Sequence, residues 1–328
     1  MRRREFIRIL GGSAVAWPFT ARAQQQSALP VVAFLRDGSA EGNARNAAGF
    51  RRGLNEAGYV ERQNVTVEYY WLEGQYDRLP TILAELVRRQ VAAIVTPGNV
   101  PTQAAKAATN VIPIIFGVGE DPVQLGLVAS LARPGGNATG TNFQTSEVLA
   151  KRLRLLHDLV PKAARVAVLV HPGNPAVSSV TVREVQKAAP TMRLEIQVLN
   201  AATIGEIDAA FATLAREHAD AMFVAPDGFF ISRRAQLVTL TARDKIPAMY
   251  STREFVDAGG LMSYGADLTE MFRQMGTYTG SILKGSKPDD LPVLQSTKFE
   301  FVINLTTAKA LGLNIPEGVL TIADDVIE

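Results

Sequence analysis

The 328-residue sequence predicts an α/β protein built from two doubly wound lobes with parallel sheets, joined by a multi-segment hinge. Short apolar runs rich in β-branched residues recur from residue 31 onward, and amphipathic helical patterns fill the gaps between them. Apolar runs of this length are typical of strands covered on both faces. The alternation of strands and helices occurs twice, which favours two similar units with right-handed crossovers.

Eight strands are expected, four in each lobe. They cover residues 31–35, 65–70, 92–96 and 113–118 in the first lobe and residues 166–170, 194–199, 221–225 and 247–250 in the second.

The expected helices carry start and stop signals. Gly58 follows an apolar stripe as a C-terminal cap residue, and Thr203 with Glu206 has the spacing of a capping box. Asp267 opens a long amphipathic helix that ends at Gly285.

A glycine-rich and polar stretch, residues 133–146, separates the two sets of strands. We therefore expect an N-terminal lobe of residues 28–143 plus about 262–292, and a C-terminal lobe of residues 144–261 plus about 293–328. The segments around residues 261–267 and 299–303 are expected to cross between the lobes, which places hinge crossings near residues 141–143 and 264–265.

Residues 1–23 have the organisation of a secretory signal peptide, with a basic start, an apolar stretch and Ala21-Arg22-Ala23 as the cleavage pattern. The run from Arg3 to Ile7 is similar to a twin-arginine export signal, so Sec and twin-arginine export both stay open. A membrane anchor is the alternative, but the apolar run of about ten residues is too short to cross a bilayer. The sequence predicts a periplasmic protein that begins near Gln24.

Composition excludes several classes of function. The formal charge is +2, but the first 23 residues carry +4, so the remainder is at −2 and offers no basic footprint for nucleic acid. There is no cysteine and there are only three scattered histidines, so no metal site or cofactor is expected. Nucleophile and dinucleotide motifs are absent, which disfavours an enzyme; an exported hydrolase on the same fold remains the alternative.

In open α/β sheets, ligands bind beyond the carboxyl ends of the strands, where helix N-termini present free N–H groups. Polar and glycine residues occupy these positions in both lobes, and two tyrosines lie at strand ends near the expected crossover. The candidate ligand-binding residues are Ser39, Thr96, Gly98, Asn99, Gly119, Asp121, Asn142, Asn174, Asp227, Tyr250 and Tyr264.

These positions suggest a ligand with a carboxylate and a cationic amine. Gly98 and Asn99 stand at the expected start of a helix, where N–H groups and the helix dipole favour an anion. Asp227 ends a strand of the other lobe and would bind the amine, with Asp121 as the next candidate. The alternative is that Asp227 only caps the helix that follows it.

Several motifs, taken together and in order, carry a family resemblance that covers nearly the whole chain. They include residues 75–80 (QYDRLP), 126–131 (GLVASL), 133–137 (RPGGN) and 259–265 (GGLMSYG). The chain resembles the ABC-transporter substrate-binding proteins related to the tryptophan-binding type.

The resemblance implies a type I periplasmic-binding fold, no catalysis, an aromatic amino acid or related ligand, and ABC permease subunits as partners of a monomer. Lipid-anchored relatives have an N-terminal cysteine, which this chain lacks. A sensor module that passes its liganded state to a receptor is the alternative to transport, and adjacent permease and ATPase genes would favour transport.

Overall fold

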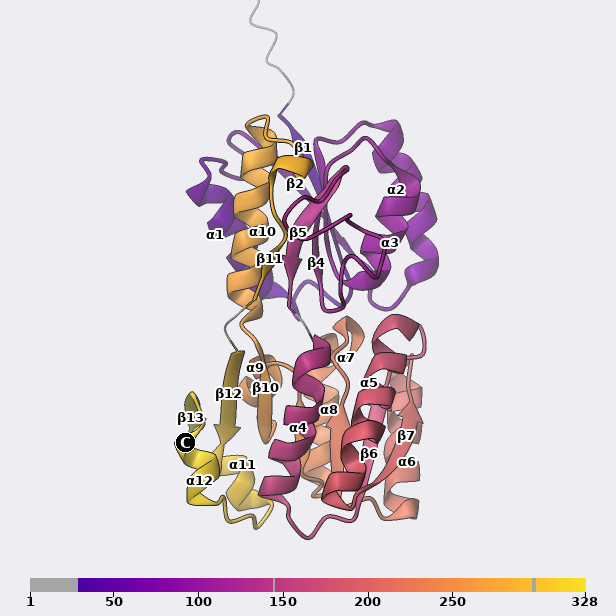
Figure 1. Ribbon diagram of the computed structural model, residues 1–328, viewed down its shortest axis with the longest axis vertical. Helices are drawn as coiled ribbons and strands as arrows, with labels where there is room; N and C mark the ends of the chain where they lie inside the picture. Colours follow the sequence, from indigo (N-terminus) through magenta and orange to yellow (C-terminus); the bar gives the residue numbers. More distant parts are fainter. Residues whose placement is uncertain (1–28, 144, 297–298) are drawn as a thin grey trace, which may run out of the picture.

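The computed structural model describes residues 29–143, 145–296 and 299–328. The predicted signal peptide and its cleavage site lie outside the described residues. The molecule consists of two α/β lobes arranged end to end, with the N-terminal lobe above the C-terminal lobe in Figure 1. None of the helices in the described ranges is both long enough and apolar enough to cross a membrane.

The N-terminal lobe contains a six-stranded sheet with the order β11-β5-β4-β3-β1-β2, and every pair in it is parallel. Its strands are β1 (Val31–Arg36), β2 (Thr66–Trp71), β3 (Ala93–Pro97), β4 (Ile114–Val118), β5 (Ala138–Asn142) and β11 (Leu294–Gln295).

The C-terminal lobe contains a seven-stranded sheet with the order β13-β12-β10-β9-β8-β6-β7. Its strands are β6 (Arg165–Val170), β7 (Glu195–Asn200), β8 (Ala221–Val224), β9 (Ala248–Tyr250), β10 (Met262–Ala266), β12 (Phe299–Asn304) and β13 (Asp325–Ile327). The pairing is parallel except between β10 and β12. Strand β12 runs antiparallel because the chain re-enters this lobe from the N-terminal lobe.

Helices cover both faces of each sheet. The N-terminal lobe has α1 (Ala44–Glu56) and α10 (Leu268–Leu283) on one face and α2 (Leu79–Arg88) and α3 (Asn99–Ala108) on the other (Figure 1). The C-terminal lobe has α4 (Thr145–Leu159) and α5 (Pro175–Ala188) on one face and α6 (Ile204–Glu217) and α8 (Arg234–Arg243) on the other. Shorter helices are α7 (Gly228–Ser232), α9 (Arg253–Asp257), α11 (Leu305–Ala310) and α12 (Glu317–Thr321), and 3-10 turns cover Tyr76–Arg78, Ala189–Met192 and Pro288–Asp290.

Central strands such as β1, β4, β6 and β8 are almost wholly apolar because consecutive side chains enter different cores, whereas the edge strands β2 and β7 carry polar side chains. In β1, Val32 and Phe34 pack against α1 and α10, whereas Ala33 and Leu35 pack under α2 and α3. All eight predicted strands are present to within one residue at each end, and the predicted fold class is confirmed.

The predicted helix signals are also present. Thr203 accepts a hydrogen bond from the Glu206 N–H at 3.2 Å, and Asp267 caps α10 by accepting one from the Glu270 N–H at 3.1 Å. Gly58 and Gly285 follow their helices with φ of 88° and 102°, the left-handed conformation expected of such glycines.

Helices α1 and α10, far apart in sequence, pack side by side through glycines (Figure 1). A Cβ at Gly53 would lie 1.8 Å from the Arg273 carbonyl oxygen, and one at Gly276 would lie 2.1 Å from the Phe50 carbonyl oxygen. Close backbone approach therefore fixes α10 on the N-terminal lobe, although it follows a strand of the C-terminal lobe.

Strand pairing moves two of the expected lobe boundaries. Residues 262–266 were expected in the N-terminal lobe, but β10 pairs with β9 and β12 in the C-terminal sheet. Residues 294–295, expected in the C-terminal lobe, pair with β5 in the N-terminal sheet. Among the described elements the chain thus crosses after β5, after β10 at Asp267, and between β11 and β12.

Candidate functional site

A cavity of about 70 Å³ lies between the lobes, at the carboxyl ends of strands from both sheets. The N-terminal lobe lines it with Arg36, Pro97, Gly98, Asn99, Gly117, Gly119, Phe143, Leu268, Met271, Phe272 and Met275. The C-terminal lobe lines it with Arg152, Asn174, Val177, Pro226, Asp227, Gly228, Ile231, Ser251, Thr252 and Ala266.

One wall of the cavity is apolar and comes from the first two turns of α10. Met271, Phe272 and Met275 are at most 3 % exposed, and they also pack on the inner face of the N-terminal sheet. Methionine side chains are flexible and polarisable, so this wall can adapt to the shape of an apolar group.

The end of β3 and the start of α3 bring Gly98 and Asn99 to the cavity. Gly98 adopts a φ of 141°, and Asn99 is 5 % exposed. Neither the amide nitrogen nor the amide oxygen of the Asn99 side chain has a hydrogen-bond partner among the described residues. A buried amide left unsatisfied in this way is suited to a polar ligand group.

On the C-terminal side, Asp227 follows β8 and its carboxylate has two protein partners. Oδ1 accepts the Phe229 N–H at 2.8 Å as the N-cap of α7, and Oδ2 accepts the Asn174 side-chain N–H at 2.9 Å. The ring Nδ1 of His171 is 3.8 Å from Oδ2. Burial raises the pKa of Asp227, and the charge of Asp37 adds to this, whereas His171 opposes it.

Arg152 of α4 is 2 % exposed and lines the same cavity. Its Nε donates to the Tyr264 carbonyl and its Nη2 donates to the Ser251 carbonyl at 3.3 Å. Its Nη1 has no hydrogen-bond partner within the described part of the chain. Burial lowers the pKa of Arg152 to about 9, so the guanidinium still carries its charge at neutral pH.

Further buried polar atoms belong to residues of the C-terminal lobe that line the cavity. The hydroxyl oxygens of Ser251 and Thr252, directly after β9, and the Oδ1 of Asn174 have no hydrogen-bond partner among the residues that the structure describes. The cavity thus combines an apolar wall from α10 with unpartnered polar atoms from both lobes, and the C-terminal lobe adds one basic and one acidic side chain, Arg152 and Asp227.

The structure brings five of the eleven predicted site residues to this cavity: Gly98, Asn99, Gly119, Asn174 and Asp227. Asp121 and Asn142 instead line a second cavity of about 430 Å³, which Gly119 also reaches. There Asp121 accepts the Val123 N–H, and Asn142 donates to the carbonyls of Val118 and Glu120.

The remaining four predicted residues line neither of these two cavities. The Ser39 hydroxyl accepts the Gly42 N–H, and the Thr96 hydroxyl accepts a hydrogen bond from Thr102. Tyr250 is fully buried, stacks on Phe255 and has its hydroxyl 3.0 Å from that of Thr241. The Tyr264 hydroxyl accepts a hydrogen bond from Lys151 at 2.9 Å.

Sequence reasoning missed the residues that dominate the cavity, including Arg152, Ser251, Thr252 and the α10 wall. The helix pattern held a signal for Arg152, because this charged residue lies in the apolar stripe of Leu149, Leu153 and Leu156. A charge on a buried helix face is a candidate binding group. The α10 residues carried no such signal, since they follow an ordinary core pattern.

No group of three or more potential metal-ligating side chains is found in the described residues. Among the side chains that the structure describes, the acidic and basic groups lining the cavity are Arg36, Arg152 and Asp227, with Asp37 and His171 close by. This arrangement can bind a molecule that carries both charges and an apolar part.

The chain is similar to known proteins along almost its whole length. A sequence model of the family described as ABC transporter substrate binding protein matches residues 31–327. The Tyrosine-binding protein of Clostridioides difficile (strain R20291) is 28% identical over 265 residues, which are 81% of this chain and 76% of that protein.

Two solved structures have the same fold over about nine-tenths of the chain. The ABC domain in complex with L-Trp from Streptococcus pneumonia has a TM-score of 0.81 and 27% identity, covering 91% of this chain and 100% of that one. A conserved domain protein from Vibrio cholerae has a TM-score of 0.80 and 26% identity, covering 90% and 99%.

Proposed function

Because the chain belongs to the ABC transporter substrate-binding protein family, we propose that it binds an α-amino acid in the cavity between its lobes and delivers it to an importer. The family and the tyrosine-binding relative are binding proteins rather than enzymes, and this chain is likewise not an enzyme. The fold is that of type I periplasmic binding proteins, which close two lobes around a ligand.

The observation that carries this proposal is the cavity itself. It takes residues from both lobes, so a ligand within it makes contacts that exist only when the lobes are together. A ligand can shift an open–closed equilibrium only through such differential contacts. Buried polar atoms without partners in both lobes, together with the apolar wall of α10, match a zwitterion with an apolar side chain.

The relatives favour an aromatic side chain, since one is named for tyrosine and another was solved with L-Trp. The volume of about 70 Å³ favours a smaller aliphatic amino acid as the second candidate, because a cavity that accommodates benzene is about 150 Å³. An aromatic ligand would require Phe272 or the methionines Met271 and Met275 to move aside.

We propose that Asp227 binds the ammonium group of the ligand. The residue does cap α7, but the cap uses only Oδ1, while Oδ2 accepts one N–H from Asn174. A carboxylate oxygen has lone pairs for more than one donor. Capping and amine binding are therefore compatible roles of the same side chain.

Delivery to permease subunits, a monomeric state and a periplasmic location are parts of the same proposal. They rest on the family and on the predicted signal peptide in residues 1–23, which lie outside the described residues. The intact mass of exported material should correspond to a start near Gln24, and an uncleaved chain would contradict the signal peptide. A genomic neighbourhood with permease and ATPase genes would favour transport over a sensor role.

Calorimetry against a panel of L-amino acids tests the binding proposal. We expect L-tyrosine, L-tryptophan or an aliphatic amino acid to bind, and small-angle scattering to show a smaller radius of gyration at saturation. An unchanged radius with a bound ligand would place the ligand outside the cavity. A panel without binders would overturn the amino-acid assignment.

A further inference from the structure

We infer that Arg152 is the residue that binds the carboxylate of the ligand, so that the C-terminal lobe holds both charged groups of the amino acid. This inference rests on the proposed function and names the chemistry of the same cavity. It moves the carboxylate away from Gly98 and Asn99, where the sequence pattern had suggested it.

The first argument is the unbalanced charge of Arg152. The side chain is 2 % exposed, and no described carboxylate is among the groups that act on its charge. Its two protein partners are the backbone carbonyls of Tyr264 and Ser251, which are neutral. Buried charges in proteins are paired, because an isolated one loses its hydration without compensation. An anion in the cavity would supply the missing partner.

The second argument is the donor of Arg152 that no described protein group engages. Nε and Nη2 are engaged by carbonyls, whereas Nη1 is buried and has no partner among the described atoms. The residue lines the cavity, so the remaining donor is available to a ligand there. A guanidinium is the side chain best suited to a planar carboxylate.

The third argument is the set of donors beside it. The hydroxyls of Ser251 and Thr252 line the same cavity and are buried without hydrogen-bond partners in the described chain. Two hydroxyl donors next to a guanidinium can satisfy the further lone pairs of a carboxylate.

The other arginine at the cavity, Arg36, does not need a ligand anion as its counter-charge. Its Nε donates to Asn43 at 3.0 Å, and its Nη1 donates to the Pro97 carbonyl at 2.7 Å. The negative charge of the adjacent Asp37 stabilises its positive charge. Asn99 offers an uncharged amide. Among these groups, Arg152 is the cation without a counter-ion.

The assignment gives each lobe a different part of the ligand to recognise. Arg152 and Asp227 lie on the C-terminal lobe, so that lobe recognises the two charged groups common to all α-amino acids. The α10 wall, fixed on the N-terminal lobe, then contacts the ligand side chain. Selectivity among amino acids would be set by Met271, Phe272 and Met275.

The test compares ligands with and without each charged group, using purified full-length mature protein. The probes are L-tyrosine, tyramine, which lacks the carboxylate, and 3-(4-hydroxyphenyl)propionate, which lacks the amine. If L-tryptophan or an aliphatic amino acid binds better, the same three forms of that amino acid are used instead. We expect wild type to bind the amino acid at least ~10-fold more tightly than the amine alone.

The variants are Arg152→Met and Arg152→Lys. We expect Arg152→Met to lose roughly 30-fold or more in affinity for the amino acid, with tyramine affinity little changed, so that selectivity for the carboxylate disappears. Arg152→Lys should keep part of that selectivity. The control is Arg154→Met on the same helix, because Arg154 is largely exposed and pairs with Asp158; its affinity should equal that of wild type.

A folded Arg152→Met protein that still prefers tyrosine over tyramine overturns the inference. If that variant does not fold, equal binding of tyrosine and tyramine by wild type overturns it instead. Wild-type binding of 3-(4-hydroxyphenyl)propionate without binding of tyrosine contradicts the proposed amino-acid function and supports the role of Arg152. Binding of none of the probes overturns both.

Discussion

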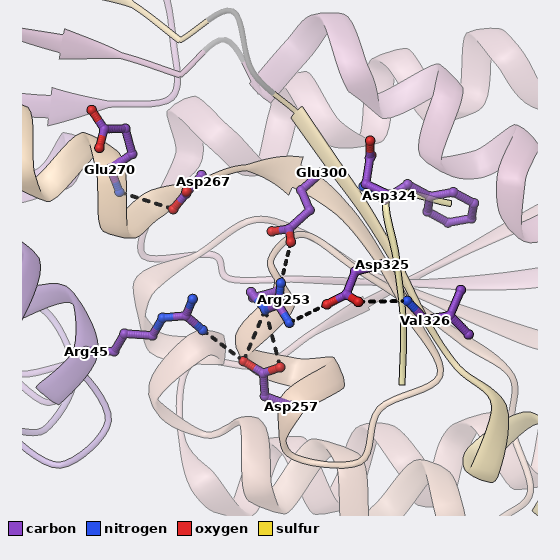
Figure 2. A network of polar contacts seen from close by, with 10 residues as sticks. Arg45, Arg253, Asp257, Asp267, Glu270, Glu300, Asp324, Asp325 and Val326 are labelled. Atoms are coloured by element: carbon purple, nitrogen blue, oxygen red, sulfur yellow. Dashed lines mark hydrogen bonds and ion pairs between the residues drawn. The ribbon is translucent and has the colours of Figure 1, made fainter. Parts of the chain in front are cut away.

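Arg45 on α1 of the N-terminal lobe forms an ion pair with Asp257 on α9 of the C-terminal lobe, with 3.1 Å between Nη1 and Oδ2. Figure 2 shows that Asp257 is also held by Arg253, which in turn contacts Glu300 of β12 and Asp325 of β13. The contact between the lobes is thus anchored next to the strand by which the chain re-enters the C-terminal lobe.

Replacing Arg45 with Gln should weaken the closed arrangement and leave each lobe intact. Both side chains are substantially exposed, at 52% and 36%, so the pair contributes only ~0.2–1 kcal/mol. Ligand affinity should fall by about 5-fold or less at low salt. The loss should vanish near ~1 M salt, where screening is strong.

Calorimetry at two salt concentrations measures this effect. The control is Arg88→Gln, since Arg88 pairs with Glu85 within α2 and does not touch the other lobe. A salt-independent loss in the Arg45 variant would mean that the ion pair is not what links closure to binding.

Gly276→Ala should destabilise the protein although alanine is the better helix former. The added Cβ would lie 2.1 Å from the Phe50 carbonyl oxygen, so α1 and α10 must separate. Overpacking of this kind costs ~1–3 kcal/mol, more than the ~1 kcal/mol that alanine gains over glycine in a helix. Urea unfolding measures the difference.

Gly205→Ala is the matched control, because a Cβ at Gly205 near the start of α6 meets nothing within 4 Å. That variant should be slightly more stable than wild type. A Gly276→Ala protein with raised stability would contradict the close packing of α1 on α10.

The fold was predictable from the sequence because its signals are local. A strand such as β1 is apolar on both faces, and the alternation of such strands with capped helices indicates a parallel sheet without knowledge of the partner strands. Caps such as Asp267 depend on hydrogen bonds to residues three positions away, so their pattern is visible in the chain itself.

The hinge was less predictable, because sheet membership depends on pairing between distant segments. Nothing local distinguishes β10, which stays in the C-terminal sheet, from a strand that has already crossed. The two-residue strand β11 is too short to show a period, although its pairing with β5 decides the boundary.

The residues of the site were predictable only where they directly follow a strand. Gly98, Asn99 and Asp227 follow strands and reach the cavity as expected. Tyr250 also ends a strand, but its side chain turns into the core and stacks on Phe255 at 4.4 Å between ring centres. Which way a side chain points at a strand end depends on sheet packing, which a local pattern does not contain.

Tyr250→Phe should therefore lower stability without affecting binding. The substitution removes a buried hydrogen bond to Thr241 at 3.0 Å, a loss of ~0.5–1.5 kcal/mol. Thermal unfolding should show the decrease, and calorimetry should show an affinity within about 2-fold of wild type. A tenfold weaker affinity would return Tyr250 to the list of ligand contacts.

Asp227→Asn tests the amine site through the pH dependence of stability and of binding. Burial raises the pKa of Asp227 above its unfolded value, and Asp37, His171, Arg36 and Tyr76 are the charged or titratable groups around it. The ionised form is therefore disfavoured in the fold. Wild-type stability should fall as the pH rises from the unfolded pKa through the raised folded pKa.

The asparagine variant has no such penalty and still caps α7, so its stability relative to wild type should increase over that same pH interval.

Its affinity for the amino acid should drop roughly 30-fold or more at neutral pH, because the ammonium loses its buried counter-charge. Wild-type affinity should decline on acidification at a higher pH than for an ordinary aspartate, since only the ionised carboxylate attracts the ammonium. Urea unfolding measures the stability of both proteins from about pH 4 to 8, and calorimetry measures their affinity over the same range. The difference between wild type and variant at each pH removes the contributions of the neighbouring titratable groups. If the variant binds as tightly as wild type at every pH, Asp227 acts only as a helix cap, and the ammonium must be bound by another group.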